Sequence, residues 1–366
     1  MKSAQEPLPK TVSLLKNGVA EGLHLGAQLY LSLQSATIAD LAIGESEPGV
    51  FMGTDTIMPW LSSTKPVAAV AIGQLWEQGK LDLDYPVSRF IPEFANQGKG
   101  EITVRHLLTH TGGFRTADQC ERGTEWATII DCICNAPLEP GWVPGKKAGY
   151  HLSGSWYLLG ELVRRLDGRP FENYVRDEIF EPVGMRDSWI GMSPDQYRQY
   201  GDRIGLMYIT EHETPELHPA LNTEFTDCAC RPGSGGRGPI RELGHFYEML
   251  LGFRREPPIS AKTVSELTSR QRRGQFDHTF KHVIDWGLGF IVNSNQYGSE
   301  TVPYGYGRHC SAETFGHSGS QSSSAFADPA HGLVAAWVCN GMPGERRHQK
   351  RARELNSAIY EDLKLG

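Results

Sequence analysis

Apolar residues recur with a helical period in some segments of the chain and with a strand-like pattern in others. Spacings of three and four residues predict helices at residues 10–23, 63–78, 156–166, 171–179, 240–251 and 344–363. Short runs rich in β-branched and other apolar residues predict strands at residues 27–33, 37–43, 286–292, 323–327 and 333–339. Gly79 is placed to end the second of these helices.

The predicted strands lie toward the two ends of the chain, and most of the predicted helices lie between them. A short polar turn separates the first two strands, which favours an antiparallel hairpin. This order predicts an α/β fold of the α+β kind, with an antiparallel sheet built from both termini, flanked by helices, and an inserted, mainly helical region. We expect a sheet domain at residues 1–85 and 275–366, a helical domain at 86–274, and an active site in the cleft between them.

Composition adds that this is an ordinary globular chain without an evident membrane or nucleic-acid partner. It has 366 residues, of which 39% are hydrophobic and 22% charged, and a formal net charge of -7. No segment is apolar and long enough to cross a bilayer, and the polar first ten residues do not resemble a signal peptide. The basic residues near the C-terminus have helical spacing between glutamates, so we interpret them as the solvated face of a helix: Arg346, Arg347, Lys350, Arg351 and Arg353.

The seven cysteines are an odd number in a chain too long to depend on disulfides, which favours a reducing compartment and a cytoplasmic location. Two close pairs, Cys132 with Cys134 and Cys228 with Cys230, are separated by one residue instead of the two that zinc sites use. We therefore expect buried free thiols that behave as small apolar residues, and no metal or other cofactor.

The first chemical motif is Ser62-Ser63-Thr64-Lys65 at the start of an apolar helix. Residues three apart on a helix share a face, so the Lys65 amine can reach the Ser62 hydroxyl and act as its base if burial lowers the lysine pKa. A helix N-terminus also offers backbone N–H groups to an oxyanion. The alternative is that Ser62 only caps the helix and Lys65 is a solvated side chain.

Further motifs along most of the chain accompany this tetrapeptide. With it, the sequence resembles class C β-lactamases, penicillin-binding proteins and their relatives among family VIII esterases, D-aminopeptidases and transacylases. The residues that carry the resemblance are 79–84 (GKLDLD), 86–87 (PV), 91–92 (IP), 107–114 (LLTHTGGF), 144–145 (PG), Tyr150, 158–161 (LLGE), 180–185 (FEPVGM), 316–319 (GHSG) and 328–329 (DP).

The resemblance implies that Tyr150 is the tyrosine of the Tyr-x-Asn element of this family, which shares proton transfer with the lysine. A phenol beside a cationic lysine is stabilised as a phenolate, so we expect Lys65 and Tyr150 to act as a pair. The asparagine position holds Leu152, and His151 and Ser153 beside it are candidate substrate-binding residues. The missing amide argues against β-lactam recognition.

The resemblance also implies that His317-Ser318-Gly319 lines the site on a strand, in the place of the family's Lys-Thr-Gly triplet. His317 is expected to face the substrate as a hydrogen-bond donor, and Gly319 to let the chain pass close to the ligand. The backbone N–H groups of Ser62 and Ser320 are expected to form the oxyanion hole. A neutral histidine is less suited than lysine to attract a carboxylate.

Other candidates carry weaker patterns. Trp142 is a candidate stacking residue for the substrate, although core packing explains it equally well. The glycine-rich residues 231–238 lack the Lys-Ser or Lys-Thr ending of a phosphate-binding loop, so we expect a flexible loop near the cleft.

The function predicted from these residues is acyl transfer through an ester on Ser62. The acyl donor is expected to be a small ester or amide, and the acceptor water, an amine or an alcohol, so that the protein is an esterase, an amidohydrolase or an ATP-independent transacylase. A β-lactamase or cell-wall D,D-peptidase is less favoured. The alternative class is a ligand-binding or sensor protein on the same fold that acylates slowly or not at all.

Overall fold

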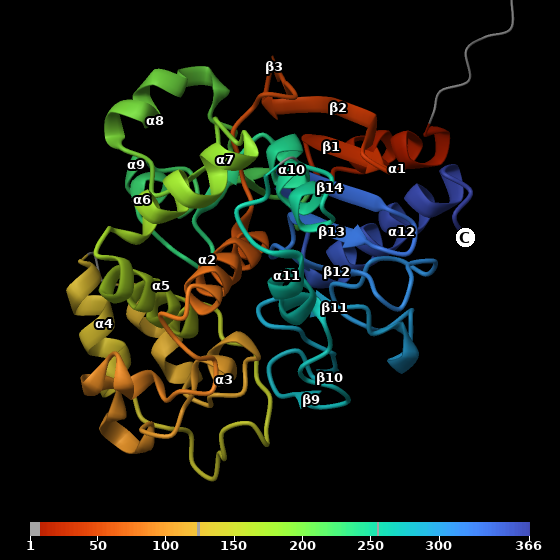
Figure 1. Ribbon diagram of the computed structural model, residues 1–366. Coiled ribbons are helices and arrows are strands. Elements are labelled where there is room, and N and C mark those ends of the chain that lie inside the picture. Colours follow the sequence, from red (N-terminus) through yellow and green to blue (C-terminus); the bar gives the residue numbers. More distant parts are fainter. Residues whose placement is uncertain (1–7, 123–124, 255) are drawn as a thin grey trace, which may run out of the picture.

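A seven-stranded antiparallel sheet assembled from both ends of the chain is the centre of the fold (Figure 1). The computed structural model describes residues 8–122, 125–254 and 256–366. The strands follow the spatial order β11 (Ile291–Val292), β12 (Phe315–Ser318), β13 (Ser323–Asp328), β14 (Leu333–Cys339), β1 (Gly26–Leu33), β2 (Ala36–Glu47) and β3 (Val50–Phe51). The ladder between β1 and β14 runs from Ala27 opposite Cys339 to Leu33 opposite Leu333 and joins the two terminal parts. The predicted fold class is therefore confirmed.

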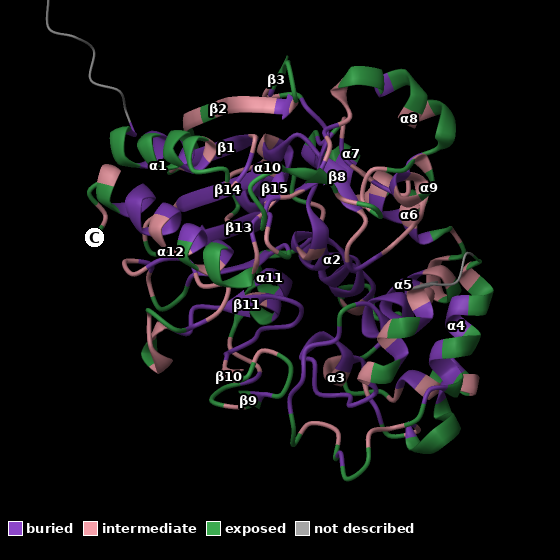
Figure 2. Cartoon of the chain, turned by 180° about the vertical axis from the view of Figure 1, so that it is seen from behind, coloured by how far each residue is buried: buried purple, intermediate pink, exposed green. Residues whose placement is uncertain are grey.

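Both faces of the central strands are buried, which explains their nearly continuous apolar sequence (Figure 2). Side chains alternate along a strand, and those of β14 enter two different apolar clusters. One set packs with α10 (Ile240–Leu250), namely Val334, Ala336 and Val338. The other set packs toward α1 (Pro9–Ala20) and α12 (Glu345–Asp362), namely Leu333, Ala335, Trp337 and Cys339.

The remaining helices lie mostly on the side of the molecule away from α1 and α12 (Figure 1). They are α2 (Lys65–Glu77), α3 (Val104–Leu108), α4 (Trp126–Asn135), α5 (Gly154–Asp167), α6 (Phe171–Val175), α7 (Glu181–Val183), α8 (Pro194–Tyr200), α9 (Glu224–Cys228) and α11 (Ala261–Thr268). Short strands complete the fold: β4 (Met58–Pro59), β5 (Trp189–Ile190), β6 (Tyr208–Ile209), β7 (Glu216–Leu217), β8 (Gly236–Gly238), β9 (Phe276–Asp277), β10 (His282–Val283) and β15 (Gly341–Met342).

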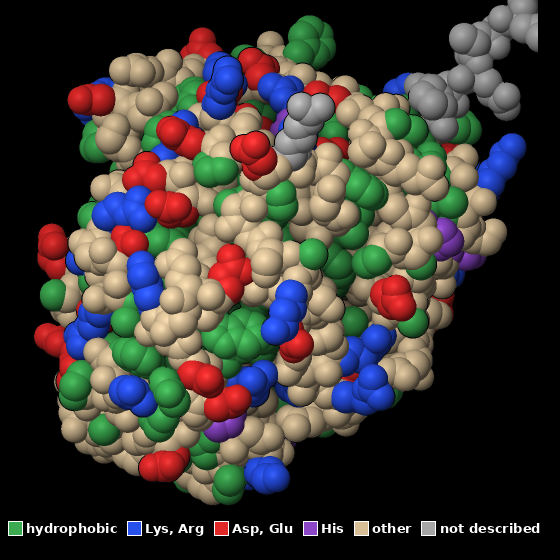
Figure 3. All heavy atoms as spheres, in the orientation of Figure 1, with side chains coloured by type: hydrophobic (Ala, Val, Ile, Leu, Met, Phe, Trp, Pro, Cys, Tyr) green, Lys and Arg blue, Asp and Glu red, His purple; other side chains and the backbone are tan. Residues whose placement is uncertain are grey.

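Helix α2 is buried along most of its length and belongs to the same apolar cluster as α5 and the α10 face of the sheet. Because this cluster runs continuously from the sheet into the helical part, the division at residues 85/86 and 274/275 stays a prediction. Among the described residues, no helix is both long enough and apolar enough to span a bilayer. On the face in Figure 3, basic and acidic side chains are interspersed.

Two predicted elements differ from the structure for local reasons. The strand expected at residues 286–292 is reduced to β11, because Gly289 adopts a φ of 84° and the Gly287 N–H donates to the Phe290 carbonyl across a turn. The helix expected at residues 171–179 is α6 followed by a π-helical turn at Arg176–Phe180. Tight-turn and π-helical geometry leave the apolar spacing almost unchanged, so the pattern does not reveal them.

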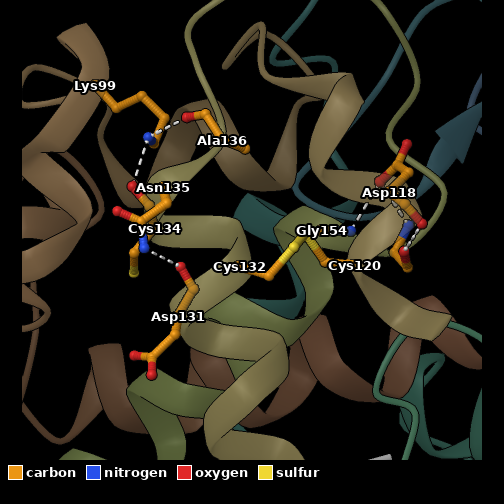
Figure 4. Close-up of a disulfide and its surroundings, with 10 residues drawn as sticks. Lys99, Asp118, Cys120, Asp131, Cys132, Cys134, Asn135, Ala136 and Gly154 are labelled. Atoms are coloured by element: carbon orange, nitrogen blue, oxygen red, sulfur yellow. Dashed lines mark hydrogen bonds between the residues drawn. A yellow bond between two sulfur atoms is a disulfide. The ribbon is translucent and has the colours of Figure 1, made fainter. Parts of the chain in front are cut away.

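The expectation that all cysteines are free is wrong, because Cys120 and Cys132 form a disulfide with their Cα atoms 5.7 Å apart (Figure 4). The bond joins the 3₁₀ segment at Arg115–Arg122 to α4. The free cysteines among the described residues are Cys134, Cys228, Cys230, Cys310 and Cys339, of which Cys228 and Cys230 are only partly buried. Disulfides are typical of oxidising compartments, so the cysteines no longer support a cytoplasmic location, which stays a prediction.

Removal of this bond is expected to destabilise the protein. A bridge between residues 12 positions apart restricts the unfolded chain, so the Cys120→Ser variant should lose about 2–3 kcal/mol of unfolding free energy. Urea unfolding measures the loss, with Cys228→Ser, a partly buried free thiol, as the matched control. Equal urea midpoints for the two variants would contradict the bond. So would seven titratable thiols in the wild type denatured without reductant.

Candidate active site

Ser62 lies in a 3₁₀ turn, Leu61–Thr64, that leads directly into α2. The residue before it, Leu61, has a φ of 51°, a left-handed conformation that costs a non-glycine residue about 1–3 kcal/mol. Surrounding contacts hold this turn: the Trp60 N–H donates to the Gly236 carbonyl at 2.8 Å, and the Ser323 hydroxyl donates to the Trp60 carbonyl at 2.7 Å. The strain therefore sits beside the nucleophile predicted from the sequence.

Lys65 is fully buried, and its amine contacts the Ser62 hydroxyl. Its Nζ lies 3.0 Å from Ser62 Oγ and 2.9 Å from the carbonyl oxygens of Leu152 and Gly233. Burial lowers the pKa of Lys65 to about 7, against smaller opposing effects of Glu121 and Asp118. A neutral amine donates its two N–H groups to the two carbonyls, which leaves its lone pair for the Ser62 proton.

Tyr150 is the third member of the cluster. The Ser62 hydroxyl is close enough to the phenol to lower its pKa, and the Tyr150 ring centroid lies 5.1 Å from Lys65 Nζ. Burial raises the pKa of Tyr150 far above its usual value, and this effect outweighs the contact with Ser62, which lowers it. The expected phenolate is therefore corrected: Tyr150 is a neutral phenol, because burial disfavours its anion and also leaves Lys65 partly uncharged.

Two carboxylates that were not anticipated hold the segment that carries Tyr150. Asp277 accepts the Tyr150 N–H at 3.1 Å and pairs with the buried Arg272 guanidinium at 3.0 Å. Asp118 accepts the backbone N–H groups of the next residues, Leu152, Ser153 and Gly154, at 2.8–2.9 Å. Figure 4 shows Asp118 with Gly154. Since the Leu152 carbonyl in turn accepts from Lys65, these carboxylates set the position of both the tyrosine and the lysine.

A cavity of about 410 Å³ opens beside these groups, and its lining is mostly apolar. Ser62, Tyr150, Leu152, His317, Ser318 and Ser320 line it, together with residues that the sequence patterns did not single out: Thr279, Phe280, Ile291, Pro303, Tyr304, Glu345 and Gln349. Leu152 is 58% exposed, so an apolar side chain borders the cavity at the position expected to hold an amide.

His317 is on β12 and lines the cavity, but its chemistry differs from the prediction. Its Nδ1 lies 2.9 Å from the Ser318 carbonyl oxygen, which can only accept, so Nδ1 carries the proton. Burial, with the nearby Lys65 charge, lowers the pKa of His317 to about 3, and the imidazole is neutral. Its Nε2 has no hydrogen-bond partner among the described residues and is an acceptor, which corrects the expected donor.

Three other candidates do not border the cavity. His151 is fully buried, with its ring 4.5 Å from that of Phe114. Ser153 is buried, and its hydroxyl donates to the Asp118 carbonyl. Trp142 is 7% exposed, and its indole N–H donates to the Thr111 carbonyl. These side chains support the loops around the site, and the structure does not bring them to the ligand cavity.

Gly319 passes close to the turn that carries Ser62 and is not among the described residues that line the cavity. A Cβ atom there would overlap the Trp60 carbonyl oxygen and the Ser323 hydroxyl and would lie 3.0 Å from the Leu61 side chain. These groups are in or beside the turn that carries Ser62, so only glycine lets β12 approach it this closely.

Comparisons with known proteins show the family and the fold that the chain shares with them. The family model described as Beta-lactamase matches residues 12–359. The chain is 27% identical over 335 residues to esterase EstB of Burkholderia gladioli, a match that covers 82% of this chain and 83% of the esterase. A penicillin-binding protein homologue from Caulobacter crescentus has a TM-score of 0.81 at 28% identity over 99% of both chains. Simvastatin synthase (LovD) from Aspergillus terreus shares the fold, with a TM-score of 0.79 at 18% identity over 99% of this chain and 100% of that chain.

The rate of acylation is expected to rise with pH through about 7, because only the neutral Lys65 amine accepts the Ser62 proton. Single-turnover acylation by p-nitrophenyl butyrate, measured from about pH 5 to pH 9, should show one ionisation that the Lys65→Met variant lacks. The variant should also acylate about 10²–10⁴-fold more slowly. A wild-type rate independent of pH, after correction for spontaneous hydrolysis, would contradict this role.

Gly319→Ala is expected to slow acylation about 100-fold, because the added methyl group displaces β12 from the Ser62 turn. The matched control is Gly100→Ala, where the new Cβ would meet only the Ala95 Cβ at 3.9 Å. Wild-type rates of p-nitrophenyl butyrate turnover in Gly319→Ala would show that the close approach is unimportant.

Proposed function

The chain belongs to the beta-lactamase family, and from this premise we propose that it transfers acyl groups from small esters or amides through a covalent ester on Ser62. The observation that carries the proposal is the 3.0 Å contact between Lys65 Nζ and Ser62 Oγ, made by an amine whose pKa burial lowers to about 7. A hydroxyl beside such a base is an activated nucleophile.

In the proposed first step, Ser62 Oγ attacks the substrate carbonyl carbon and its proton passes to Lys65. The negative charge that develops on the carbonyl oxygen is stabilised by the backbone N–H groups of Ser62 and Ser320, both of which belong to residues that line the cavity. The bond to the leaving group then breaks. Tyr150 gives its phenol proton to the leaving atom and regains one from Lys65, so the serine proton ends on the leaving group.

The second step is the reverse of the first with a new nucleophile. Water, an alcohol or an amine gives its proton to the phenol and lysine pair and attacks the acyl-enzyme, and Ser62 leaves with a proton. Water yields an acid, and an alcohol or amine yields a new ester or amide. The esterase relative and the fold shared with simvastatin synthase support keeping both outcomes within the proposal.

Two observations argue against penicillins and carboxylate-ended peptides as substrates. No lysine or arginine is among the described residues that line the cavity, so no cation there attracts a carboxylate. The exposed Leu152 side chain offers no amide to the substrate. The mutual contacts of Ser62, Lys65 and Tyr150 argue against a binding or sensor protein that does not acylate.

Incubation with p-nitrophenyl butyrate is expected to give a butyryl adduct that peptide mapping assigns to Ser62. Ser62→Ala should form no adduct and lose turnover by at least about 10³-fold. Ser13→Ala, in the exposed part of α1, is the matched control and should behave as the wild type. Intact mass spectrometry and p-nitrophenol release measure the two effects.

Turnover that survives in Ser62→Ala, or a wild type that neither acylates nor turns over activated esters, would refute the proposal. The second result would favour the sensor alternative. Products formed in the presence of butanol or butylamine then divide transfer from hydrolysis, because a transacylase releases the new ester or amide instead of butyrate.

A further inference from the structure

The cavity beside Ser62 contains one carboxylate, and it comes from the first residue of α12. Among the described residues that line the cavity, Glu345 is the sole carboxylate, and none is lysine or arginine. No described lysine or arginine is within ion-pair distance of its side chain. Its contacts are instead with neutral groups: the Tyr304 phenol donates to its two oxygens at 2.7 and 2.9 Å, and the Gln349 amide donates at 3.2 Å. This exposed carboxylate is therefore open to a cationic ligand.

Tyr304 is held beside this carboxylate in an unfavourable backbone conformation. Its φ is 55°, which is rare for an aromatic residue and persists only where surrounding contacts enforce it. The Tyr304 N–H donates to the Gln349 side-chain oxygen at 2.8 Å, and the phenol is anchored on Glu345. Gln349 is one turn further along α12, so this helix fixes both ends of the tyrosine. Such strain is found mostly at ligand-binding and catalytic positions.

Aromatic contacts place Tyr304 on the Tyr150 side of the cavity, the side from which the leaving group departs in the proposed mechanism. The Tyr150 ring centroid lies 4.8 Å from that of Phe280, which lies 5.8 Å from that of Tyr304. Ser320 and Tyr304 both line the cavity beside Tyr150. Because Tyr150 is the group that passes a proton to the leaving atom and takes one from the acceptor, the groups beside it face that part of the substrate.

The polar groups of this half of the cavity are suited to a hydrogen-bond donor or a cation. His317 Nε2 is a buried acceptor to which no group in the described part of the chain donates. The faces of Tyr304 and Phe280 carry the negative potential that attracts cations, and the Glu345 carboxylate adds a full charge. The Glu345 carboxylate would repel a carboxylate ligand, and a neutral alkyl group would make no favourable electrostatic interaction with it.

We propose that Glu345, Tyr304 and Phe280 form a subsite for an ammonium group carried by the leaving alcohol or amine of the donor, or by the acyl acceptor. The inference rests on the proposed acyl transfer through Ser62 and adds the chemical class of one substrate: an amino alcohol or a polyamine, in which a cation lies a few atoms from the reacting oxygen or nitrogen. Glu345 binds the charge, and the two aromatic faces bind the groups around it.

Two esters of equal shape test this subsite. Butyrylcholine and 3,3-dimethylbutyl butyrate have the same acyl group and leaving groups that differ by one positive charge. The wild type should show a kcat/KM about tenfold higher for the choline ester, as expected for an exposed ion pair combined with a cation–π contact. In Glu345→Gln, which keeps an oxygen to accept from Tyr304, the ratio should fall to about twofold or less. A high salt concentration screens the exposed charges, so it should also lower the wild-type ratio of the two kcat/KM values.

The matched control is Glu361→Gln, which removes the same charge from the same helix at a residue paired with Lys10, and it should keep the wild-type ratio. A wild-type ratio near one, no turnover of the choline ester by a protein that p-nitrophenyl butyrate acylates on Ser62, or an unchanged ratio in Glu345→Gln would overturn the subsite. Failure of the neutral activated ester to acylate Ser62 would instead overturn the acyl-transfer proposal. The two failures are therefore distinguishable.

Discussion

The arrangement of the site depends on a single buried amine. Lys65 has no exposed surface, and its amine hydrogen-bonds Ser62 Oγ and the carbonyl oxygens of Leu152 and Gly233, all at 2.9–3.0 Å. Those neighbours come from the 3₁₀ turn, the segment before α5 and the loop before β8, so one side chain links three separate parts of the chain. Burial makes the charged form costly, and the two carbonyls satisfy the N–H groups of the neutral form.

The surrounding structure keeps that amine from water and from movement. Asp118 and Asp277 hold the backbone on either side of His151, and the buried Arg272 neutralises Asp277. The Cys120–Cys132 bond lies in the same segment as Asp118 and restricts it. On the other side, Gly319 lets β12 approach the Ser62 turn, which brings His317 and Ser320 to the cavity. The contacts that hold these segments therefore also hold the amine in the position from which it transfers the proton.

Sequence patterns predicted the parts of this arrangement that depend on local spacing. The positions of Ser62 and Lys65 follow from helical periodicity, and the strands of the central sheet follow from their apolar runs. Tyr150, His317 and Ser320 came from resemblance to a family, since nothing local distinguishes them. The protonation states of Tyr150 and His317 were not predictable, because they depend on burial and on a carbonyl supplied by folding. Glu345 and Tyr304 are 41 positions apart, and only the tertiary structure brings their side chains together.

Lys65 loses its proton near pH 7 while its amine contacts Ser62, and the proposed acyl transfer depends on this ionisation. Carbon NMR of protein labelled at the lysine Cε, with the resonance assigned by its loss in Lys65→Met, measures this ionisation without reference to any substrate. The expected titration midpoint of this lysine is about 7. A resonance that stays at the position of a charged amine up to about pH 10, as for an ordinary solvated lysine, would contradict it.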